Sequence, residues 1–568
     1  MLSKGVDIQQ FLADSIGMYL RSTVRHNRDG AEVRYLQLAE NVWDKDKGCA
    51  VAKVVYNFGR ADQVDEVALR RLAKSITRFL SPEEAIKAQA ELSGDSADEM
   101  RFLESRPFGG GFLLGELWRT LGIGDVIEQL VEDRAFRTPV ERAVFAMVAN
   151  RALAPASKRH AAEWLKQDVA LPEVGEIPLQ QFYRAMDVLL GAEEQLQRQV
   201  FEQVARLFNL DVDLLFFDTT STYFERDEED GMRRFGHSKD SRPDRPQVVV
   251  GLAVTREGIP VRVWSWPGNT TDVTRIKVVR EDLRGWRLGR VIQVVDRGFV
   301  SEENLKEMTR GGDHYIAGVK MRAGQEHIDE ALSRPGRYQK VRENIEIKEI
   351  IVGEGERRER YILVRNPKEA ERDKKKREDI LRSLEAELSA IKELPQGHQR
   401  SACHLLVHSA YGRYLLLDPK TGKVRLNKQR IREDERLDGK YLIRTSDDTL
   451  TPEDVALGYR QLAEIEDAFR TLKQTLELRP VYHRLDDRIR AHVLLCWLAL
   501  LLIRVAETNV QDTWPSIRDT MQRMHLGKFS GPNGTVWRRT ETTPPQVAIL
   551  RTLGIKEPPI IHRVEVAT

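Results

Sequence analysis

Two aspartates each end an apolar run that is typical of a buried β-strand. Asp218 ends the run LLFFD and Asp296 ends the run VIQVVD. An ionised carboxylate at such a place costs free energy unless it pairs with a cation or binds a metal. Ligation by oxygen atoms suits Mg²⁺ or Mn²⁺, and two such ions can support displacement at a phosphodiester. The two residues therefore predict a divalent-metal site; the alternative is that each caps the next element or pairs with an arginine such as Arg297.

A second group of carboxylates lies in YRQLAEIEDAFRTLK, residues 459–473, whose apolar side chains recur at the spacing of one helical face. On a continuous helix Asp467 falls opposite the apolar stripe, so we expect it to face solvent. Glu464 and Glu466 lie on the two flanks of the stripe, and periodicity does not choose between them.

One side of this predicted helix combines an aromatic ring, a carboxylate and two cations. Tyr459, Glu466 and Lys473 follow one another at intervals of seven residues and share this side, and Arg470 follows Glu466 at i+4. A carboxylate among such neighbours suits a metal ligand beside side chains that grip a phosphate backbone. The alternative is an exposed face stabilised by salt bridges, which is the commoner use of these residue types.

The segments around the two aspartates alternate in the order of an α/β sheet. Three strands follow one another directly, and two more alternate with helices, which is the order of a ribonuclease-H-like sheet. After a long interruption, residues 440–446 resume as a strand, and Thr451–Pro452–Glu453 gives the cap, proline and acid that begin the next helix. The five earlier strands are expected within 213–225, 246–255, 259–268, 290–299 and 313–320.

The remaining pattern divides the chain into further sections. The N-terminal part is β-like, with a hairpin signal at Asp29–Gly30. The next part has short helices with Lys and Arg near their ends, which suits a DNA-binding module or a helical packing domain. A highly charged part with β-like pieces and one long helix is interpreted as a mixed α/β insertion. The expected sections are 1–100 (β-rich), 101–205 (helical), 206–320 (core, first part), 321–439 (insertion), 440–512 (core, second part) and 513–568 (C-terminal tail).

Composition limits the classes of protein that fit. Apolar residues make up 41% of the chain and charged residues 31%, so we expect a globular protein with a large core. The net charge is only +2, so any DNA surface must be a local basic patch. The three cysteines lack CxxC spacing, which argues against disulfide frameworks and zinc sites and fits a reducing compartment. No signal peptide is evident, and the apolar run 493–503 is too short to span a bilayer, so it predicts a buried core helix in a cytoplasmic protein without a membrane partner.

Several segments, in order, carry a family resemblance. FFDTTSTYFE, PGNTTD, VVDRGF and the Y-x6-E-x6-K pattern of residues 459–473 resemble the DD(E) transposases of the bacterial insertion-sequence group with a Tyr-Arg-Glu-Lys signature. RIRAHVLLCWLALLL, the N-terminal MYLRSTVRHNRDG and the helical MVANRALAPASKRHAAEWL extend the resemblance over most of the chain. It implies a ribonuclease-H-like core with an insertion, cleavage and strand transfer of insertion-sequence ends, and Mg²⁺ (or Mn²⁺) as cofactor.

The resemblance also implies roles for particular residues and partners. Asp218, Asp296 and Glu466 would form the metal-binding triad, and Tyr459 and Lys473 would contact the DNA backbone near the cleaved end. Residues 101–205 would bind the terminal inverted repeats of double-stranded DNA, and a homodimer would hold paired ends and attack target DNA, in a protein associated with the bacterial nucleoid.

This chain departs from the group in two ways. The signature arginine, three residues after the tyrosine, falls on Leu462. Helical geometry directs Arg460 away from Glu466, so we assign the role to Arg470. Residues 321–440 contain no tryptophan of the kind that stacks on a flipped base in the group, which removes the basis for expecting a hairpin intermediate.

Three other functions fit some of these residues. A metal-dependent nuclease of the same fold would share the triad and lack strand transfer. A DNA-binding repressor would lack catalysis, which an intact triad argues against. A two-carboxylate glycosidase is the most remote alternative, because nothing in the sequence indicates a sugar-binding cleft.

Overall fold

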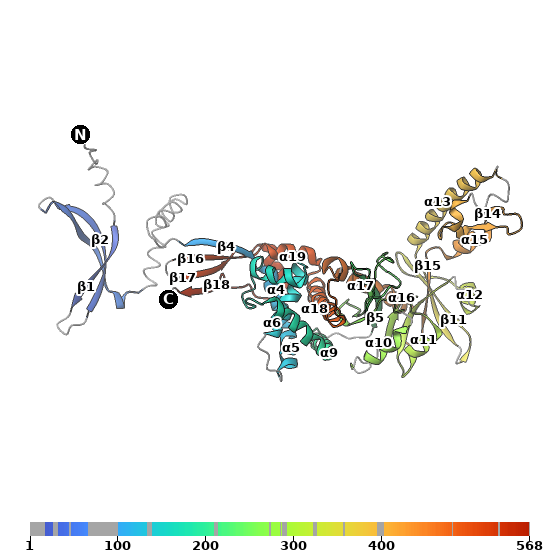
Figure 1. The fold of residues 1–568 in the computed structure, drawn as a ribbon, viewed down its shortest axis with the longest axis horizontal. Coiled ribbons are helices and arrows are strands. Elements are labelled where there is room, and N and C mark those ends of the chain that lie inside the picture. Colours follow the sequence, from blue (N-terminus) through green and yellow to red (C-terminus); the bar gives the residue numbers. More distant parts are fainter. Residues whose placement is uncertain are drawn as a thin grey trace. The chain divides into compact units, whose positions relative to one another are not determined.

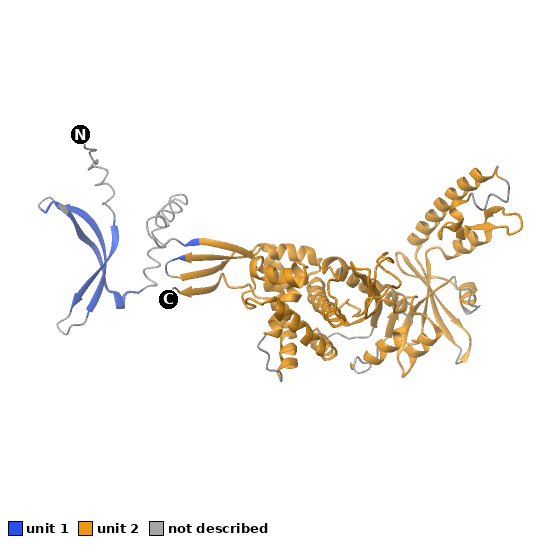
Figure 2. Cartoon of the chain, in the orientation of Figure 1, with its two compact units in different colours: residues 1–101, 531–533 blue, residues 102–530, 534–568 orange. Residues whose placement is uncertain are grey.

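The computed structural model describes residues 18–566 except for several gaps, of which the longest is 66–99. The gaps are 27–31, 45–46, 66–99, 133–138, 209–213, 272–273, 284–285, 287–291, 322–325, 356–357, 393, 395–402, 480 and 532–533. The expected turn at Asp29–Gly30 lies outside the described residues. The chain forms two compact units, residues 1–101 with 531–533 and residues 102–530 with 534–568 (Figure 2).

The first unit contains an antiparallel three-stranded sheet in the order β1-β2-β3 (Figure 1). The long strands arise from alternating apolar and polar residues, as the sequence predicts. Their bounds are β1 Met18–His26, β2 Glu32–Asp44 and β3 Cys49–Arg60.

The second unit begins at Phe102 within β4, Arg101–Pro107, and continues with a group of helices. Helix α6 is buried along nearly its whole length and contacts both α8 and the later helix α18. Ser157 caps α7 by accepting a hydrogen bond from the His160 amide at 3.3 Å. The helices are α4 Gly109–Thr120, α5 Ile123–Val131, α6 Val140–Leu153, α7 Lys158–Gln167, α8 Leu179–Gly191 and α9 Glu193–Leu207.

A nine-stranded mixed sheet forms the centre of this unit, in the order β10-β11-β12-β15-β9-β8-β5-β6-β7. Strands β5, β6 and β7 pair antiparallel, while β8 and β9 run parallel to β5, in the order that the sequence predicts. The elements are β5 Leu214–Tyr223, β6 Gln247–Thr255, β7 Pro260–Pro267, α10 Ile276–Leu283, β8 Ile292–Val295, α11 Glu302–Thr309 and β9 His314–Val319.

The sheet continues beyond β9 through strands that come from a later part of the chain. Strand β15, Lys440–Thr445, pairs antiparallel with both β9 and β12. Strands β10, β11 and β12 fall within the section 321–439 that the sequence assigns to the insertion, yet they extend the same sheet. Their bounds are β10 Gln339–Arg342, β11 Ile345–Val352 and β12 Glu359–Arg365, and α12, Glu326–Ser333, precedes them.

Residues 366–439 leave this sheet and return to it at adjacent positions. Arg365 of β12 lies opposite Lys440 of β15, and the Asn366 amide donates to the Gly439 carbonyl at 2.7 Å. Between these points the chain has its own small apolar core, which includes Leu384, Tyr414 and Val424. Its elements are α13 Pro367–Ile391, β13 Leu415–Leu417, β14 Val424–Leu426 and α15 Lys428–Leu437.

The C-terminal part supplies helices that pack on the sheet and a second small sheet in the order β18-β17-β16-β4. The helices before α18 are α16 Pro452–Arg460, α17 Leu462–Arg470 and a π-helical turn, Thr471–Thr475. The remaining elements are α18 Asp486–Val510, α19 Trp514–Gln522, β16 His525–Gly531, β17 Gly534–Arg539, α20 Pro544–Thr552 and β18 Ile561–Val566.

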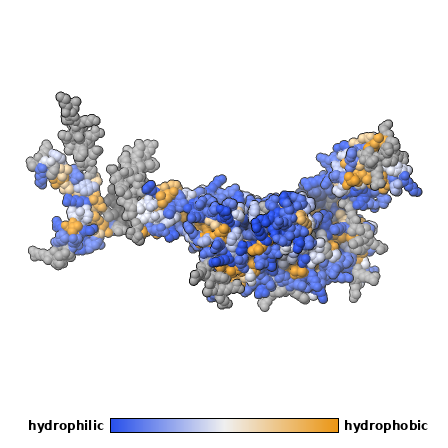
Figure 3. Space-filling model, in the orientation of Figure 1, coloured by the Kyte–Doolittle hydropathy of each residue, from blue (hydrophilic) through white to orange (hydrophobic). Residues whose placement is uncertain are grey.

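Helix α18 forms the centre of the largest apolar cluster, and residues 493–503 within it are all buried, as the sequence predicts. Among the described residues it is the one helix with the length and composition of a membrane span, but 89% of its apolar window is buried inside the protein. Hydrophilic side chains predominate on the face of this unit drawn in Figure 3, in keeping with an enclosed apolar helix.

Candidate active site

The two strand aspartates lie side by side on neighbouring parallel strands. In the register of β5 and β8, Phe217 is opposite Val295, so Asp218 and Asp296 occupy the next position on each strand. Strand β5 does not end at Asp218 but continues to Tyr223, and Asp218 interrupts an otherwise buried run. The Asp218 side chain is thus partly accessible to solvent beside the end of β8.

Asp218 has a cationic neighbour from the loop between β5 and β6. Its Oδ1 accepts a hydrogen bond from the Thr219 amide at 2.7 Å and lies 3.6 Å from the Lys239 ammonium nitrogen. The Lys239 ammonium also donates to the carbonyl and the hydroxyl of Thr219, both at 2.8 Å. Lys239 therefore supplies positive charge at the place where a metal ion would neutralise Asp218.

Asp296 is held by a tyrosine from α16. The Tyr459 hydroxyl donates to Asp296 Oδ1 at 3.0 Å. The ring passes close to β9, where a Cβ atom on Gly318 would lie 2.0 Å from the hydroxyl oxygen. Burial and the charge of Asp296 raise the pKa of Tyr459, so the hydroxyl remains a donor near neutral pH.

The three carboxylates of α17 have distinct surroundings. Glu464 forms an ion pair with Arg504 of α18 at 2.6 Å. Asp467 is partly exposed and pairs with Arg470 at 2.6 Å, as expected of a solvated residue. Glu466 is exposed and makes no hydrogen bond or ion pair with any described side chain. Glu466 is thus the carboxylate of the three that is available to a ligand.

Asp218, Asp296 and Glu466 line one pocket of about 390 Å³, together with Tyr459 and Arg460. Three carboxylates from a sheet and a helix fit a divalent cation, because such cations prefer carboxylate oxygens. Among the described residues, however, no three His, Cys, Asp or Glu side chains are close enough to form a ready ligand group. The structure therefore brings the predicted triad to one pocket without closing it into a cage.

The expectation of one continuous helix over 459–473 is wrong. Helix α16 ends at Arg460, and the Glu464 amide bonds the Gln461 carbonyl three residues back, which tightens the chain between the two helices. A π-helical turn follows, in which the Leu476 amide bonds the Thr471 carbonyl. Both irregularities rotate the later side chains about the helix axis relative to their positions on the ideal helix that the sequence prediction assumed.

This shift changes which cations reach the pocket. Arg460, which the ideal helix directs away from Glu466, lines the pocket, whereas Arg470 lies beside Asp467. Lys473 does not line it either, because its side chain is only 12% exposed and its ammonium pairs with Asp240 at 2.7 Å. Burial lowers the pKa of Lys473, and the bond to Asp240 opposes that effect.

The sequence prediction missed Lys239 and Asp240. Asp240 is 4% exposed and is held by Lys473 and Arg479, which fixes the loop that carries Lys239. Lys239 itself is anchored through its amide, which donates to the Ser221 hydroxyl at 2.8 Å. Lys239 and Asp240 lie in the basic run RRFGHSKDSRP, residues 233–243, but no local pattern links this run to Asp218.

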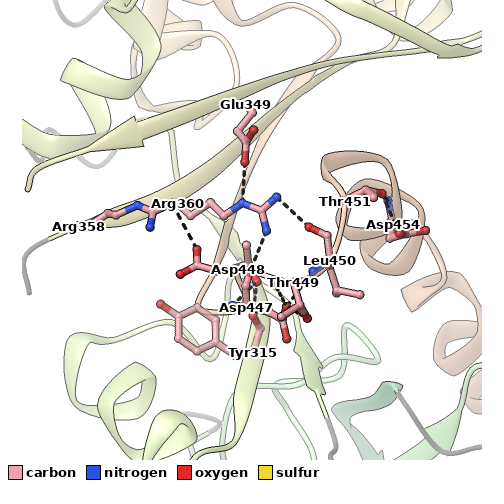
Figure 4. A network of polar contacts seen from close by, with 11 residues as sticks. Tyr315, Glu349, Arg358, Arg360, Asp447, Asp448, Thr449, Leu450, Thr451 and Asp454 are labelled. Atoms are coloured by element: carbon pink, nitrogen blue, oxygen red, sulfur yellow. Dashed lines mark hydrogen bonds and ion pairs between the residues drawn. The ribbon is translucent and has the colours of Figure 1, made fainter. Parts of the chain in front are cut away.

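A buried arginine fixes the start of α16, which carries Tyr459. Arg360 of β12 donates to the carbonyls of Asp447 and Leu450 at 2.6 and 2.9 Å and to Glu349 at 2.7 Å (Figure 4). Asp447 in turn accepts from the amides of Thr449 and Leu450. These bonds hold the loop directly before the N-cap, Thr451, so that Tyr459 reaches Asp296.

A larger cavity of about 650 Å³ adjoins the pocket and shares Asp296 and Tyr459 with it. Its other wall belongs to residues 366–439, which contribute Lys376, Arg377 and Arg413. Arg377 and Arg413 pair with Asp438 and Asp434. Over the whole cavity, six Lys and Arg side chains face four Asp side chains, which leaves an excess of positive charge. The cavity gives a cationic surface beside the predicted triad.

Comparisons with known proteins agree with these features. The sequence profile described as "Transposase DDE domain" matches residues 212–502, more than half of the chain, and that of the "IS1634 family transposase, N-terminal domain" matches residues 20–89. No curated protein matches the chain. A solved structure with some similarity is the cryo-EM piggyBac transposase synaptic complex with hairpin DNA, at 10% identity and a TM-score of 0.34, with 72% of this chain and 79% of that chain covered.

Proposed function

Because the chain belongs to the DDE transposase family, we propose that Asp218, Asp296 and Glu466 carry its metal-dependent cleavage and strand transfer of DNA. The protein is a transposase of an insertion sequence and acts on DNA with divalent metal ions. The observation that carries the proposal is that the three carboxylates, 248 residues apart at most in the sequence, line one pocket.

The chemistry of the site follows from its donors. Divalent ions, when bound by these carboxylates, supply an activated water and stabilise charge on the oxygens that enter and leave phosphorus. Asp218 and Asp296 lie beside each other on the sheet, so both would hold a divalent ion together with Glu466. Tyr459 keeps Asp296 in place through its hydroxyl, and Lys239 holds Asp218 until metal and DNA arrive.

The finer features of the proposal rest on the arrangement of the second unit. The strand order β7-β6-β5-β8-β9 supports a ribonuclease-H-like core, with residues 366–439 as the part of the insertion that leaves the sheet. The cationic cavity beside the pocket supports a path for the DNA end along Lys376 and Arg413. We further propose Mg²⁺ as the physiological ion, inverted repeats and target DNA as substrates, a homodimer on paired ends, and action in the bacterial cytoplasm.

A cleavage and joining assay tests the proposal. The substrate is a linear duplex that carries the inverted repeat found beside the gene, with Mg²⁺ and a target plasmid. Asp218→Asn and Asp296→Asn should abolish cleavage and strand transfer while the band shift of the duplex persists, because metal activation contributes several kcal/mol. We expect losses of about 10³-fold or more, since 1.4 kcal/mol is tenfold.

Asp467→Asn is the matched control, since Asp467 lies on α17 outside the pocket and should retain activity. Full activity of Asp218→Asn or Asp296→Asn would contradict the assignment. Cleavage without joining by the wild-type protein would favour the nuclease, and binding without cleavage would favour the repressor.

A further inference from the structure

A second polar pocket lies outside the candidate active site, where α6 ends, α7 begins and both meet the start of α18. Its volume is about 70 Å³. We call it the Lys158 pocket; its polar walls include Arg151, Lys158, His483 and His492. Arg151, Lys158 and His492 are only 5%, 3% and 4% exposed. Four basic residues thus line one small space. Burial lowers the pKa of His483 to about 3 and that of His492 well below its ordinary value, so Arg151 and Lys158 supply the positive charge.

No Asp or Glu is among the described residues that line the Lys158 pocket. The Glu477 carboxylate, whose charge opposes the lowering of the Arg151 pKa by burial, lies outside this lining. The Arg151 guanidinium donates hydrogen bonds to backbone carbonyls, those of Leu476 and Glu477 at 3.2 and 3.3 Å and that of Ala156. Arg151 Nε and His492 Nδ1 are nevertheless buried without a hydrogen-bond partner, and the Lys158 side chain makes no hydrogen bond or ion pair with the described residues although Lys158 is only 3% exposed. A buried cation without a partner is costly, and a bound anion would offset that cost.

The surroundings favour an anion over a metal cation. Cys496 Sγ lies 3.9 Å from His492 Nε2, but the positive charge of Arg151, and that of Lys158 when it is protonated, would repel a metal ion there. The N-terminus of α7 opens at Ser157 and Lys158, where unsatisfied amides and the helix dipole favour negative charge. Burial, followed by the charge of Arg151, lowers the pKa of Lys158 to about 7, an effect that a bound anion would reverse.

We propose that the Lys158 pocket binds a single phosphate group, with Lys158, His492 and the α7 N-terminus as its recognition groups. The volume of about 70 Å³ is several times the roughly 10–15 Å³ that one water requires, which suits a tetrahedral oxyanion and excludes a nucleoside. The phosphate is either a DNA backbone phosphate or the free ion. The site shares no lining residue with the pocket of Asp218, Asp296 and Glu466, so it does not rest on their assignment.

Binding of inorganic phosphate to the full-length chain tests the site directly. In equilibrium dialysis with labelled phosphate, EDTA and constant ionic strength, we expect saturable binding of about one phosphate per chain. Phosphate in place of chloride should also raise the unfolding temperature by about 2–4 °C. Lys158→Met should lose both effects, and its unfolding temperature in chloride should equal or exceed that of the wild type because an unpaired buried charge is removed.

Lys375→Met, an exposed lysine on α13, is the matched control and should bind phosphate as the wild type does. Absence of saturable binding to the wild-type chain would overturn the proposal, whether or not Lys158→Met folds. So would equal phosphate responses of the wild type and Lys158→Met.

The source of the phosphate follows from the salt dependence of binding to a non-specific 20-bp duplex. Loss of one DNA phosphate contact reduces the slope of log K against log salt by about 0.9. A smaller slope for Lys158→Met assigns the site to the DNA backbone. An unchanged slope, with phosphate binding lost, assigns it to the free ion. Cleavage activity enters neither measurement, so failure of the proposed function would leave this inference standing.

Discussion

Glu464, Glu466 and Asp467 acquire different roles although they lie within four residues of one another. Arg504 engages Glu464 and Arg470 engages Asp467, while Glu466 faces the pocket of the two strand aspartates. Helical periodicity separated Asp467 from the other two, but the ion pair with Arg504 comes from a helix 40 residues later. Sequence could therefore nominate the carboxylates and the family pattern could favour Glu466, whereas only tertiary contacts distinguish it physically.

Tyr459 is expected to act through Asp296 rather than through the DNA backbone. Tyr459→Phe removes a hydrogen bond to a charged group, worth about 1.5–3 kcal/mol, so cleavage should fall by about 10–100-fold. Affinity for the DNA end should stay unchanged. Rates at saturating DNA, compared with band-shift affinities, separate the two effects. Tyr441→Phe is the control, because Tyr441 also lines the pocket and the centroid of its ring lies 5.7 Å from that of Tyr459. Weaker end binding with normal cleavage would restore the role in DNA contact that the resemblance implies.

Lys473 is expected to stabilise the loop of Lys239 instead of binding phosphate. Lys473→Met leaves buried Asp240 with Arg479 as its remaining cation. The free energy of unfolding should therefore fall by about 1–3 kcal/mol, which lowers the midpoint of urea unfolding. The salt slope of DNA binding should not change. Arg470→Met, which breaks an exposed pair, should leave the midpoint nearly unchanged. A salt slope reduced by about 0.9 would instead show that Lys473 contacts a phosphate.

Helices α16 and α17 show where local sequence stops determining an element. Thr451 and Pro452 begin α16 as predicted, because cap and proline act locally. The break at Gln461 has no glycine or proline to announce it, and the π-helical turn at Thr471–Thr475 has none either. Both fit the helices to the sheet and to α18, so they depend on packing that the sequence pattern does not contain.

Arg360 is expected to determine where α16 begins. Arg360→Met removes a buried guanidinium that bonds the Asp447 and Leu450 carbonyls, and should destabilise the fold by about 3 kcal/mol. Cleavage should fall as well, since Tyr459 loses its position. Arg358 lies two residues before Arg360 and forms an exposed ion pair with Asp448. Arg358→Met, the control, should change the free energy of unfolding by less than about 0.5 kcal/mol. Equal thermal unfolding of the two variants would refute this role.

At the scale of the whole molecule, the sheet combines segments that are distant in sequence. The order of β5 to β9 was largely predictable because the pairs β5-β6, β6-β7 and β8-β9 are consecutive in the chain, while β8 crosses over to pair with β5. Residues 440–446, which contain β15, were expected as a strand of the core, but the extension of the sheet by β12, β11 and β10 was not expected, because the pairing of β12 with β15 across residues 366–439 leaves no local signal. Lys473 and Asp240 are 233 residues apart in the sequence, so their ion pair was unpredictable for the same reason.

Residues 367–438 are expected to be dispensable for folding and required for cleavage. Their removal joins Asn366 to Gly439, an Asn-Gly turn between the paired residues Arg365 and Lys440. The removed segment has its own apolar core, so the main core stays intact. Circular dichroism should show cooperative thermal unfolding near the wild-type temperature, while end cleavage is lost with the wall of the cationic cavity. A deletion variant that aggregates or lacks a transition would contradict the separation of the two cores.

The most direct test of the account compares Glu466→Gln with Glu464→Gln in Mg²⁺-dependent cleavage of the inverted-repeat duplex. The two residues lie on one helix and the substitutions are identical, so effects on helix stability are matched. We predict that Glu466→Gln binds the duplex but cleaves it about 10³-fold more slowly or not at all, and that Glu464→Gln retains cleavage. Cleavage by Glu466→Gln together with its loss in Glu464→Gln would contradict the assignment of the triad.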